Sequence, residues 1–121
     1  PNPYPKFYFK ELYRANPKSF FVAENEGKIL GYIIGRERTG IGEIVSVAVD
    51  PIWRRKKIGQ SLVNSLISYF QKGSLKEISL HVRISNQVGI LFHQSLGFEI
   101  IEKIENYYPD GEAAFLMKKE I

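Results

Sequence analysis

An apolar strand, a sharp turn, a basic loop and a helix follow one another within Val45–Leu62 (VSVAVDPIWRRKKIGQSL). The strand, Glu43–Val49, has largely apolar residues on both faces, which is typical of a central strand covered on both sides. Asp50-Pro51 ends this strand, and Arg54–Lys57 places four consecutive basic residues before the next helix. Backbone amides at a helix start attract anions, and basic side chains add to that attraction. We therefore expect a site for a phosphate-bearing ligand across the end of a sheet.

Size and composition exclude several classes of protein. A chain of 121 residues has the length of one domain, and its net charge of +4 gathers largely in Arg54–Lys57. There is no cysteine, and two histidines alone do not make a usual metal site, so we expect no disulfide and no metal. No apolar run approaches the roughly 20 residues of a membrane span, and no signal peptide is visible. We expect a cytoplasmic protein without a membrane partner.

Periodicity and turn residues predict an alternation of helices and strands. The predicted helices are 5–15, 58–69 and the segment between Asn86 and Gly97; the predicted strands are 20–24, 28–36, 43–49, 77–84, 98–104 and 112–118. Asn25-Glu26-Gly27 is a predicted hairpin turn, and Gly73 marks the end of the second helix. Because a helix connects strands 43–49 and 77–84, these two strands are expected to run parallel. The order indicates an α/β (α+β) fold.

Five segments in order resemble one family. They are PNPYPKFYF, VSVAVDPIWRRKKIG, SLHVRISN, LFHQSLGFEII and NYYPDGEAAFLMKK. Together they are similar to the GNAT superfamily of acetyl-CoA-dependent N-acetyltransferases, and within it to the protein N-terminal acetyltransferases, including the archaeal enzymes and the ribosomal-protein alanine acetyltransferases. The resemblance implies a mixed central sheet with flanking helices, in which the two parallel middle strands splay apart.

The resemblance also bears on the start of the chain. Family members open with a strand and a first helix before the segment that matches Pro1–Phe9, and neither is visible in this sequence. We expect residues 1–121 to be one acetyltransferase domain that is incomplete at its N-terminus. If the chain begins at Pro1, the strand Phe20–Glu24 has an open edge that a second copy could cover, as in a homodimer.

The resemblance implies acetyl-CoA or CoA as the cofactor. The pantetheine arm is expected in the gap beside the splayed strand, against the backbone of Val47, Ala48 and Val49. The residues implied to hold the pyrophosphate are Arg54, Arg55, Lys56, Lys57, Ile58, Gly59, Gln60 and Ser61. Asn86 matches an asparagine near the pantetheine arm, although its role as a helix cap is sufficient by itself.

Two positions depart from the family pattern. Lys57 stands where a glycine is usual; either it tolerates a helical backbone there and adds charge, or it reduces cofactor affinity, and we favour the first interpretation. Phe92 stands where many members have a tyrosine that protonates the departing thiolate, so that role is lost or moved. The Phe92 ring is expected to keep only its packing function beside the cofactor.

The implied catalytic residues are Glu43, His81 and Tyr108. Glu43 begins the central strand at a position where relatives carry a functional histidine or tyrosine, and His81 matches a histidine used as a base. Histidine has a suitable unperturbed pKa for that task. His93, next to a glutamine on a predicted helix, is expected to face solvent.

Tyr107 and Tyr108 indicate the substrate. In the N-terminal acetyltransferases the matching tyrosine pair closes over the substrate and leaves a slot for a peptide terminus, and Tyr4 matches the opposite wall. A peptide α-amino group has a pKa near about 8, against about 10.4 for lysine, so its deprotonation at neutral pH costs far less. We predict acetyl transfer from acetyl-CoA to protein N-termini.

Two other functions remain open from the sequence. The first is acetylation of lysine side chains or a small amine by the same fold. The second is a non-catalytic module that binds CoA or nucleic acid, which the departures at Lys57 and Phe92 would suit. A nucleic-acid partner is the weaker interpretation of the basic loop, because no interleaved aromatic residues accompany it.

Overall fold

The structure is a computed structural model that describes residues 19–54 and 57–121. The helix predicted over 5–15 and the candidate residues Tyr4, Arg55 and Lys56 lie outside these ranges. The elements are β1 (Phe20–Asn25), β2 (Lys28–Arg38), β3 (Ile41–Val49), a 3-10 turn η1 (Pro51–Trp53), α2 (Ile58–Lys72), β4 (Glu77–Arg83), α3 (Gln87–Ser95), β5 (Glu99–Ile104) and β6 (Ala114–Glu120). Every element predicted within the described ranges is present.

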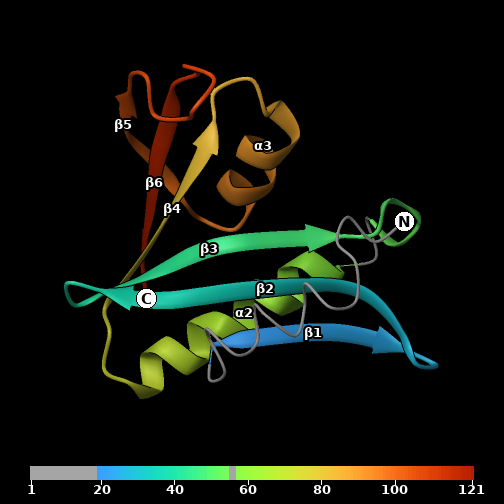
Figure 1. Cartoon of the computed structure of the whole chain (residues 1–121). Coiled ribbons are helices and arrows are strands. Elements are labelled where there is room, and N and C mark those ends of the chain that lie inside the picture. Colours follow the sequence, from blue (N-terminus) through green and yellow to red (C-terminus); the bar gives the residue numbers. More distant parts are fainter. Residues whose placement is uncertain (1–18, 55–56) are drawn as a thin grey trace.

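The strands form one mixed sheet in the order β1-β2-β3-β4-β6-β5 (Figure 1). The β3 and β4 strands are parallel, as the helical crossover between them predicted, and the other neighbours are antiparallel. The predicted turn between β1 and β2 is confirmed by the positive φ angles of Glu26 and Gly27, which match a two-residue hairpin turn. The sheet confirms the α+β class, with β3 in the middle.

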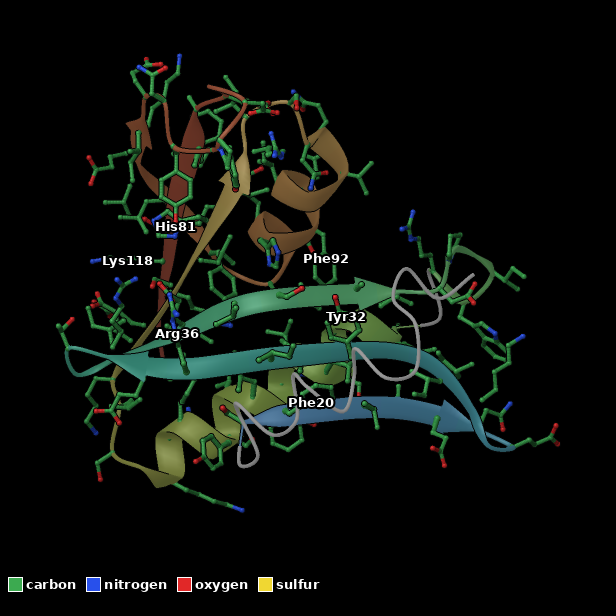
Figure 2. All side chains as sticks on the ribbon, in the orientation of Figure 1. Phe20, Tyr32, Arg36, His81, Phe92 and Lys118 are labelled. Atoms are coloured by element: carbon green, nitrogen blue, oxygen red, sulfur yellow. The ribbon has the colours of Figure 1, made fainter. Side chains whose placement is uncertain are left out.

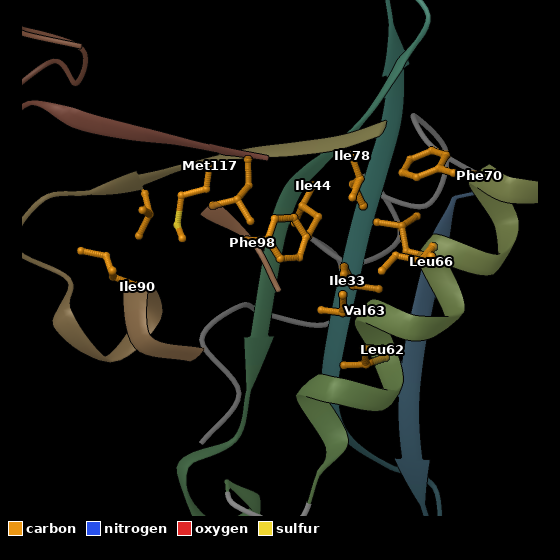
Figure 3. Close-up of a cluster of buried hydrophobic side chains, with 13 residues drawn as sticks. Ile33, Ile44, Leu62, Val63, Leu66, Phe70, Ile78, Ile90, Phe98 and Met117 are labelled. Atoms are coloured by element: carbon orange, nitrogen blue, oxygen red, sulfur yellow. The ribbon is translucent and has the colours of Figure 1, made fainter. Parts of the chain in front are cut away.

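Both helices contribute to one continuous core on a single face of the sheet. Leu66 and Phe70 of α2, Ile90 of α3 and strand residues such as Ile33 and Ile78 belong to the same buried cluster (Figure 3). Because side chains alternate along a strand, the residues between these core positions point to the opposite face. On β4 that second face carries the polar residues Ser79, His81 and Arg83, whereas on β2 it carries a smaller buried cluster around Tyr32 and Ile34.

Two glycines bring α2 close to the sheet. A Cβ atom at Gly35 would lie 2.6 Å from Leu66 Cδ1, and one at Gly42 would lie 2.4 Å from Phe70 Cδ2. Any larger residue at either position would push the helix or its side chains away. The close approach fixes α2 against the region where β3 begins.

A bulge in β3 interrupts the alternation of side chains along this strand. Ile34 pairs with Ser46, whereas the next residue of β2, Gly35, pairs with Ile44, so Val45 is an extra residue on β3. A bulge shifts the facing of every side chain beyond it. Ile44 and Val47 consequently both pack on the core face, and Val45 is 46% exposed.

None of the helices in the described part of the chain has the length and apolar character needed to cross a membrane.

Candidate active site

The two parallel middle strands separate after their first residues. Within residues 19–54 and 57–121, β3 and β4 pair only at Gly42 with Ile78 and at Glu43 with Ser79. Beyond these two pairs the strands diverge, as Figure 1 shows. The predicted splay is confirmed, and its vertex lies at Glu43 and Ser79.

The helix α2 begins beside the open end of this splay. Lys57 is its N-cap, and no side chain of the described residues caps the helix. The first N–H groups of a helix have no acceptor within the helix, so those of α2 are available to an anion. Arg54 is exposed on the same loop, and its Nε donates to the carbonyl oxygen of Val49 at 3.3 Å.

The interpretation that Lys57 has a helical backbone is wrong. Its φ of 63° and ψ of 17° are left-handed. This conformation disfavours residues with a Cβ atom and suits glycine, which explains why a glycine is usual at this position in the resembled family. Lys57 therefore adds a positive charge at the start of α2 at the cost of local backbone strain.

We expect Lys57→Gly to stabilise the protein without ligand by about 0.5–1 kcal/mol, because glycine relieves the left-handed strain but gains freedom in the unfolded chain. Urea unfolding measures this change. Lys57→Ala is the matched control: it removes the same charge but keeps a Cβ atom, so it should not stabilise. Equal stability of the two variants would contradict the explanation that relief of backbone strain at position 57 causes the stabilisation.

Phe92 fills the space between α3 and the start of α2. A Cβ atom at Gly59 would lie 2.9 Å from Phe92 Cζ and 3.7 Å from Val49 Cγ2, so glycine allows this close contact. Figure 2 shows Phe92 beside the open half of β3. The ring also packs against the core, which agrees with the packing function expected for it.

Asn86 serves as the cap of α3. Its Oδ1 accepts a hydrogen bond from the Gly89 N–H at 2.9 Å. A Cβ atom at Gly89 would lie 2.6 Å from Asn86 Nδ2, so the glycine makes room for the cap. The start of α3 thus has a side-chain cap, whereas the start of α2 has none among residues 19–54 and 57–121.

An open groove of about 400 Å³ extends from the N-cap of α2 along the helix. Its lining is polar and uncharged except at Lys57, and consists of Lys57, Gln60, Ser61, Asn64, Ser65 and Ser68. Gln60 and Ser61, which the family resemblance implies as cofactor-binding, therefore line the same groove as Lys57.

Glu43 and His81 both lie near the vertex, on the face opposite the helices. Glu43 is buried, and Arg36 Nε donates to its Oε1 at 2.6 Å. His81 lies two residues beyond the Ser79 pair on β4. Burial lowers the pKa of His81, and the cations Arg38 and Arg36 lower it further, against the opposing effect of Glu43. At neutral pH the imidazole is uncharged and can accept a proton.

Two tyrosines from the β5–β6 loop cover alternate residues of β4. The ring of Tyr107 stacks on His81 with centroids 4.5 Å apart and an interplanar angle of 14°. The guanidinium of Arg83 lies 4.1 Å from the centroid of the Tyr108 ring. Burial raises the pKa of Tyr108, so its phenol stays protonated and can donate a hydrogen bond. The structure brings Glu43, His81, Tyr107 and Tyr108 into one region.

Sequence reasoning missed three polar residues of this face. Arg36 pairs with Glu43, Arg83 contacts Tyr108, and Ser46 shares a 3.0 Å hydrogen bond with the hydroxyl of Tyr32, which is buried. Arg83 could have been found from strand alternation, because it lies two residues beyond His81 and faces the same side. The face on which Ser46 lies could not be predicted, because the bulge at Val45 changes the alternation of side chains along β3.

The expectation that His93 faces solvent is wrong. The side chain is 6% exposed, and its ring makes edge contacts with Phe92 and Phe98 at centroid distances of 5.0 and 5.5 Å. Its Nδ1 has no hydrogen-bond partner among the described residues. Burial lowers the pKa of His93 to about 4. Its spacing of three residues from Ile90 was the helical signal for burial.

Comparisons with known proteins agree with the resemblance. The sequence model of the Acetyltransferase (GNAT) family matches residues 1–98. The N-alpha-acetyltransferase of Sulfurisphaera tokodaii is 34% identical over 130 residues, covering 97% of this chain and 78% of the relative. Ard1 from Thermoplasma volcanium superposes with a TM-score of 0.87 at 29% identity, over 98% of this chain and 80% of that one. Naa20 from Chaetomium thermophilum, solved with a bisubstrate analogue, also superposes with a TM-score of 0.87. It is 27% identical, over 99% of this chain and 75% of that one. This chain belongs to the GNAT acetyltransferase family.

Proposed function

We propose that the protein transfers the acetyl group of acetyl-CoA to the α-amino group of protein or peptide N-termini. The observation that carries the proposal is the pairing of Tyr107 with His81 and of Tyr108 with Arg83 above the vertex of the splay. The relatives named N-alpha-acetyltransferase support the same reaction. Acetyl-CoA supplies the acetyl group as an activated thioester.

The residues at the open end of the splay fit such a donor. The N-terminus of α2, where Lys57 makes no side-chain cap, and the charge of Lys57 favour a pyrophosphate, and Arg54 lies on the same loop. The diverging half of β3, which includes Val47, Ala48 and Val49, has no strand partner on its β4 side among the described residues. Backbone N–H groups there would stabilise charge on the thioester oxygen.

At the vertex, His81 is the proposed base. It would take a proton from the substrate ammonium group, either directly or through water, because its neutral imidazole is held next to Tyr107. Glu43, ion-paired to Arg36, would favour the protonated imidazole that then forms. Tyr108 would donate a hydrogen bond, and with Tyr107 it would line one wall of the peptide slot.

The proposed substrate suits this machinery. Deprotonating an α-amino group at pH 7 costs about 1 kcal/mol, whereas lysine costs about 4–5 kcal/mol. A single neutral histidine near the surface is adequate for the first task. Phe92 has no hydroxyl to protonate a thiolate, so that proton must come from another group or from solvent.

A peptide library incubated with acetyl-CoA tests the substrate. We expect acetyl groups on N-terminal amines, located by mass spectrometry after fragmentation, and none on lysine when the N-terminus is already blocked. Acetylation of lysine side chains alone would contradict the proposal that protein N-termini are the substrate. Salt-dependent binding to nucleic acid, with no thermal shift from acetyl-CoA, would contradict the proposal that the protein is an acetyltransferase.

A further inference from the structure

Arg83 connects the end of β4 to the loop that carries the two tyrosines. This loop, residues 105–113, is called the tyrosine loop below. Arg83 Nη1 donates to Asp110 Oδ2 at 2.9 Å and to Glu112 Oε1 at 2.8 Å. The same guanidinium lies over the Tyr108 ring. One side chain thus makes three contacts with three different residues of the loop.

The two carboxylates are themselves fixed in place. The second oxygen of Glu112 accepts from the N–H of Ser85, two residues after the end of β4, at 3.0 Å. The second oxygen of Asp110 accepts from the N–H of Glu112 at 3.0 Å. Hydrogen bonds from Ser85 and Arg83 lower the pKa of Glu112, and that from the Glu112 N–H lowers the pKa of Asp110. The acceptors of Arg83 therefore stay charged through neutral and mildly acidic pH.

The contacts repeat along β4 with the spacing of a strand face. His81 and Arg83 are two residues apart and point to the same side, and each is covered by one of two consecutive tyrosines. The two tyrosine rings also meet edge to face, with centroids 5.0 Å apart. A shift of Tyr108 relative to Arg83 must therefore move Tyr107 relative to His81.

We propose that Arg83 is a positioning residue that holds the tyrosine loop on β4 through Asp110, Glu112 and the Tyr108 ring, and so keeps Tyr107 stacked on His81. The inference rests on the proposed function for its effect on catalysis, but the arrangement itself stands on contacts within the chain. An exposed ion pair alone contributes little, whereas these contacts form a network that ends at a proposed catalytic side chain.

The loss of this positioning has two measurable consequences. The slot for the peptide loosens, so the KM for the peptide rises more than that for acetyl-CoA. Tyr107 also ceases to shield His81, so the pKa of His81 returns toward its ordinary value. The other groups near His81 stay in place in the test variants; they are Arg36 and Arg38 on β2, Glu43 on β3, Glu102 on β5 and Lys118 on β6.

Arg83→Gln in the full chain is the central variant. We expect the peptide KM to rise about 5- to 10-fold, with the acetyl-CoA KM within 2-fold of the parent. The sequence holds only two histidines, His81 and His93, so their ring protons are easily separated by NMR. The His81 signal should lose its ring-current shift and titrate at higher pH, while the signal of buried His93 should not change.

Three further variants separate positioning from general damage. Lys103→Gln removes a cation from the strand before the same loop, where Lys103 Nζ lies 3.5 Å from Glu105, and should change neither readout. Arg83→Lys keeps the charge but loses the planar group, so it should restore the His81 signal only in part. Glu112→Gln should reproduce the effect of Arg83→Gln even if that variant folds poorly.

An unchanged peptide KM together with an unchanged His81 titration in both Arg83→Gln and Glu112→Gln would overturn the inference. Failure of the proposed function has a different signature. In that case the parent protein acetylates no peptide N-terminus, yet the NMR titration still reports whether Arg83 controls the position of Tyr107 over His81.

Discussion

His81→Gln is expected to lower kcat at pH 7 by about 10²–10⁴-fold, the usual contribution of a positioned general base. Glutamine keeps a polar side chain of similar reach but cannot take up a proton. The residual rate should rise steadily with pH, because the free amine then forms without help. Steady-state kinetics with a peptide and acetyl-CoA at several pH values measure both effects.

Glu43→Gln is the matched variant, because the Glu43 carboxylate is the other candidate general base near the vertex. Its carboxylate accepts from Arg36 at 2.6 Å, so it is less available as a base than the neutral imidazole. We expect a smaller loss of about 10-fold, from weaker stabilisation of protonated His81. A loss in Glu43→Gln that exceeds the loss in His81→Gln would transfer the role of base to Glu43.

The protein should lose about 2 kcal/mol of stability between pH 7 and pH 5 because of His93. Burial lowers the pKa of His93 from 6.5 to about 4 in the folded protein, so the unfolded chain binds more protons between these values. A lowered pKa means that this stability is present above pH 6.5 and is lost as the pH falls toward 4. Urea unfolding at pH 7 and pH 5 measures the difference.

His93→Leu isolates the contribution of this side chain. Leucine suits the aromatic contacts with Phe92 and Phe98 and cannot be protonated. The variant should be at least as stable as the parent at pH 7, because the parent leaves His93 Nδ1 buried without a partner among the described residues. It should also be less sensitive to acid. Parallel losses in the two proteins would assign the acid sensitivity to other groups.

The sequence allowed most of the fold to be predicted, because local signals determine most of it. Hydrophobic periodicity identified α2, the alternation of Ile78, Leu80 and Val82 identified β4, and a helical crossover implied that β3 and β4 are parallel. The mixed sheet and the splay followed from the family resemblance, whereas the order of the strands came from the structure. Interpretation of residues 1–121 as one domain stays a prediction.

Errors arose where spatial context overrides a local pattern. The bulge at Val45 depends on how β2 pairs with β3, which an alternating sequence does not reveal. The glutamine beside His93 suggested an exposed face, but tertiary packing buries the histidine. The left-handed backbone of Lys57 was indicated only by the glycine that the family prefers.

Several of the site contacts join residues that are far apart in the sequence. Arg83 contacts Asp110 and Glu112, which follow it by 27 and 29 positions in the sequence, and His81 contacts Tyr107. Propensity and spacing carry no information on such pairs. The resemblance named His81 and the tyrosines separately, and the structure shows which tyrosine covers which residue of β4.

The two-pair contact between β3 and β4 has a consequence for motion. It divides the sheet into a β1–β2–β3 part under α2 and a β4–β6–β5 part under α3, which share few backbone hydrogen bonds. Such an arrangement can act as a hinge at Glu43 and Ser79, because a small rotation there breaks no other strand pairing. A ligand bound between β3 and β4 would contact both parts of the sheet and so connect them, as an extra strand between them would. Binding would then raise the cooperativity of unfolding and slow amide exchange on both sides of the gap.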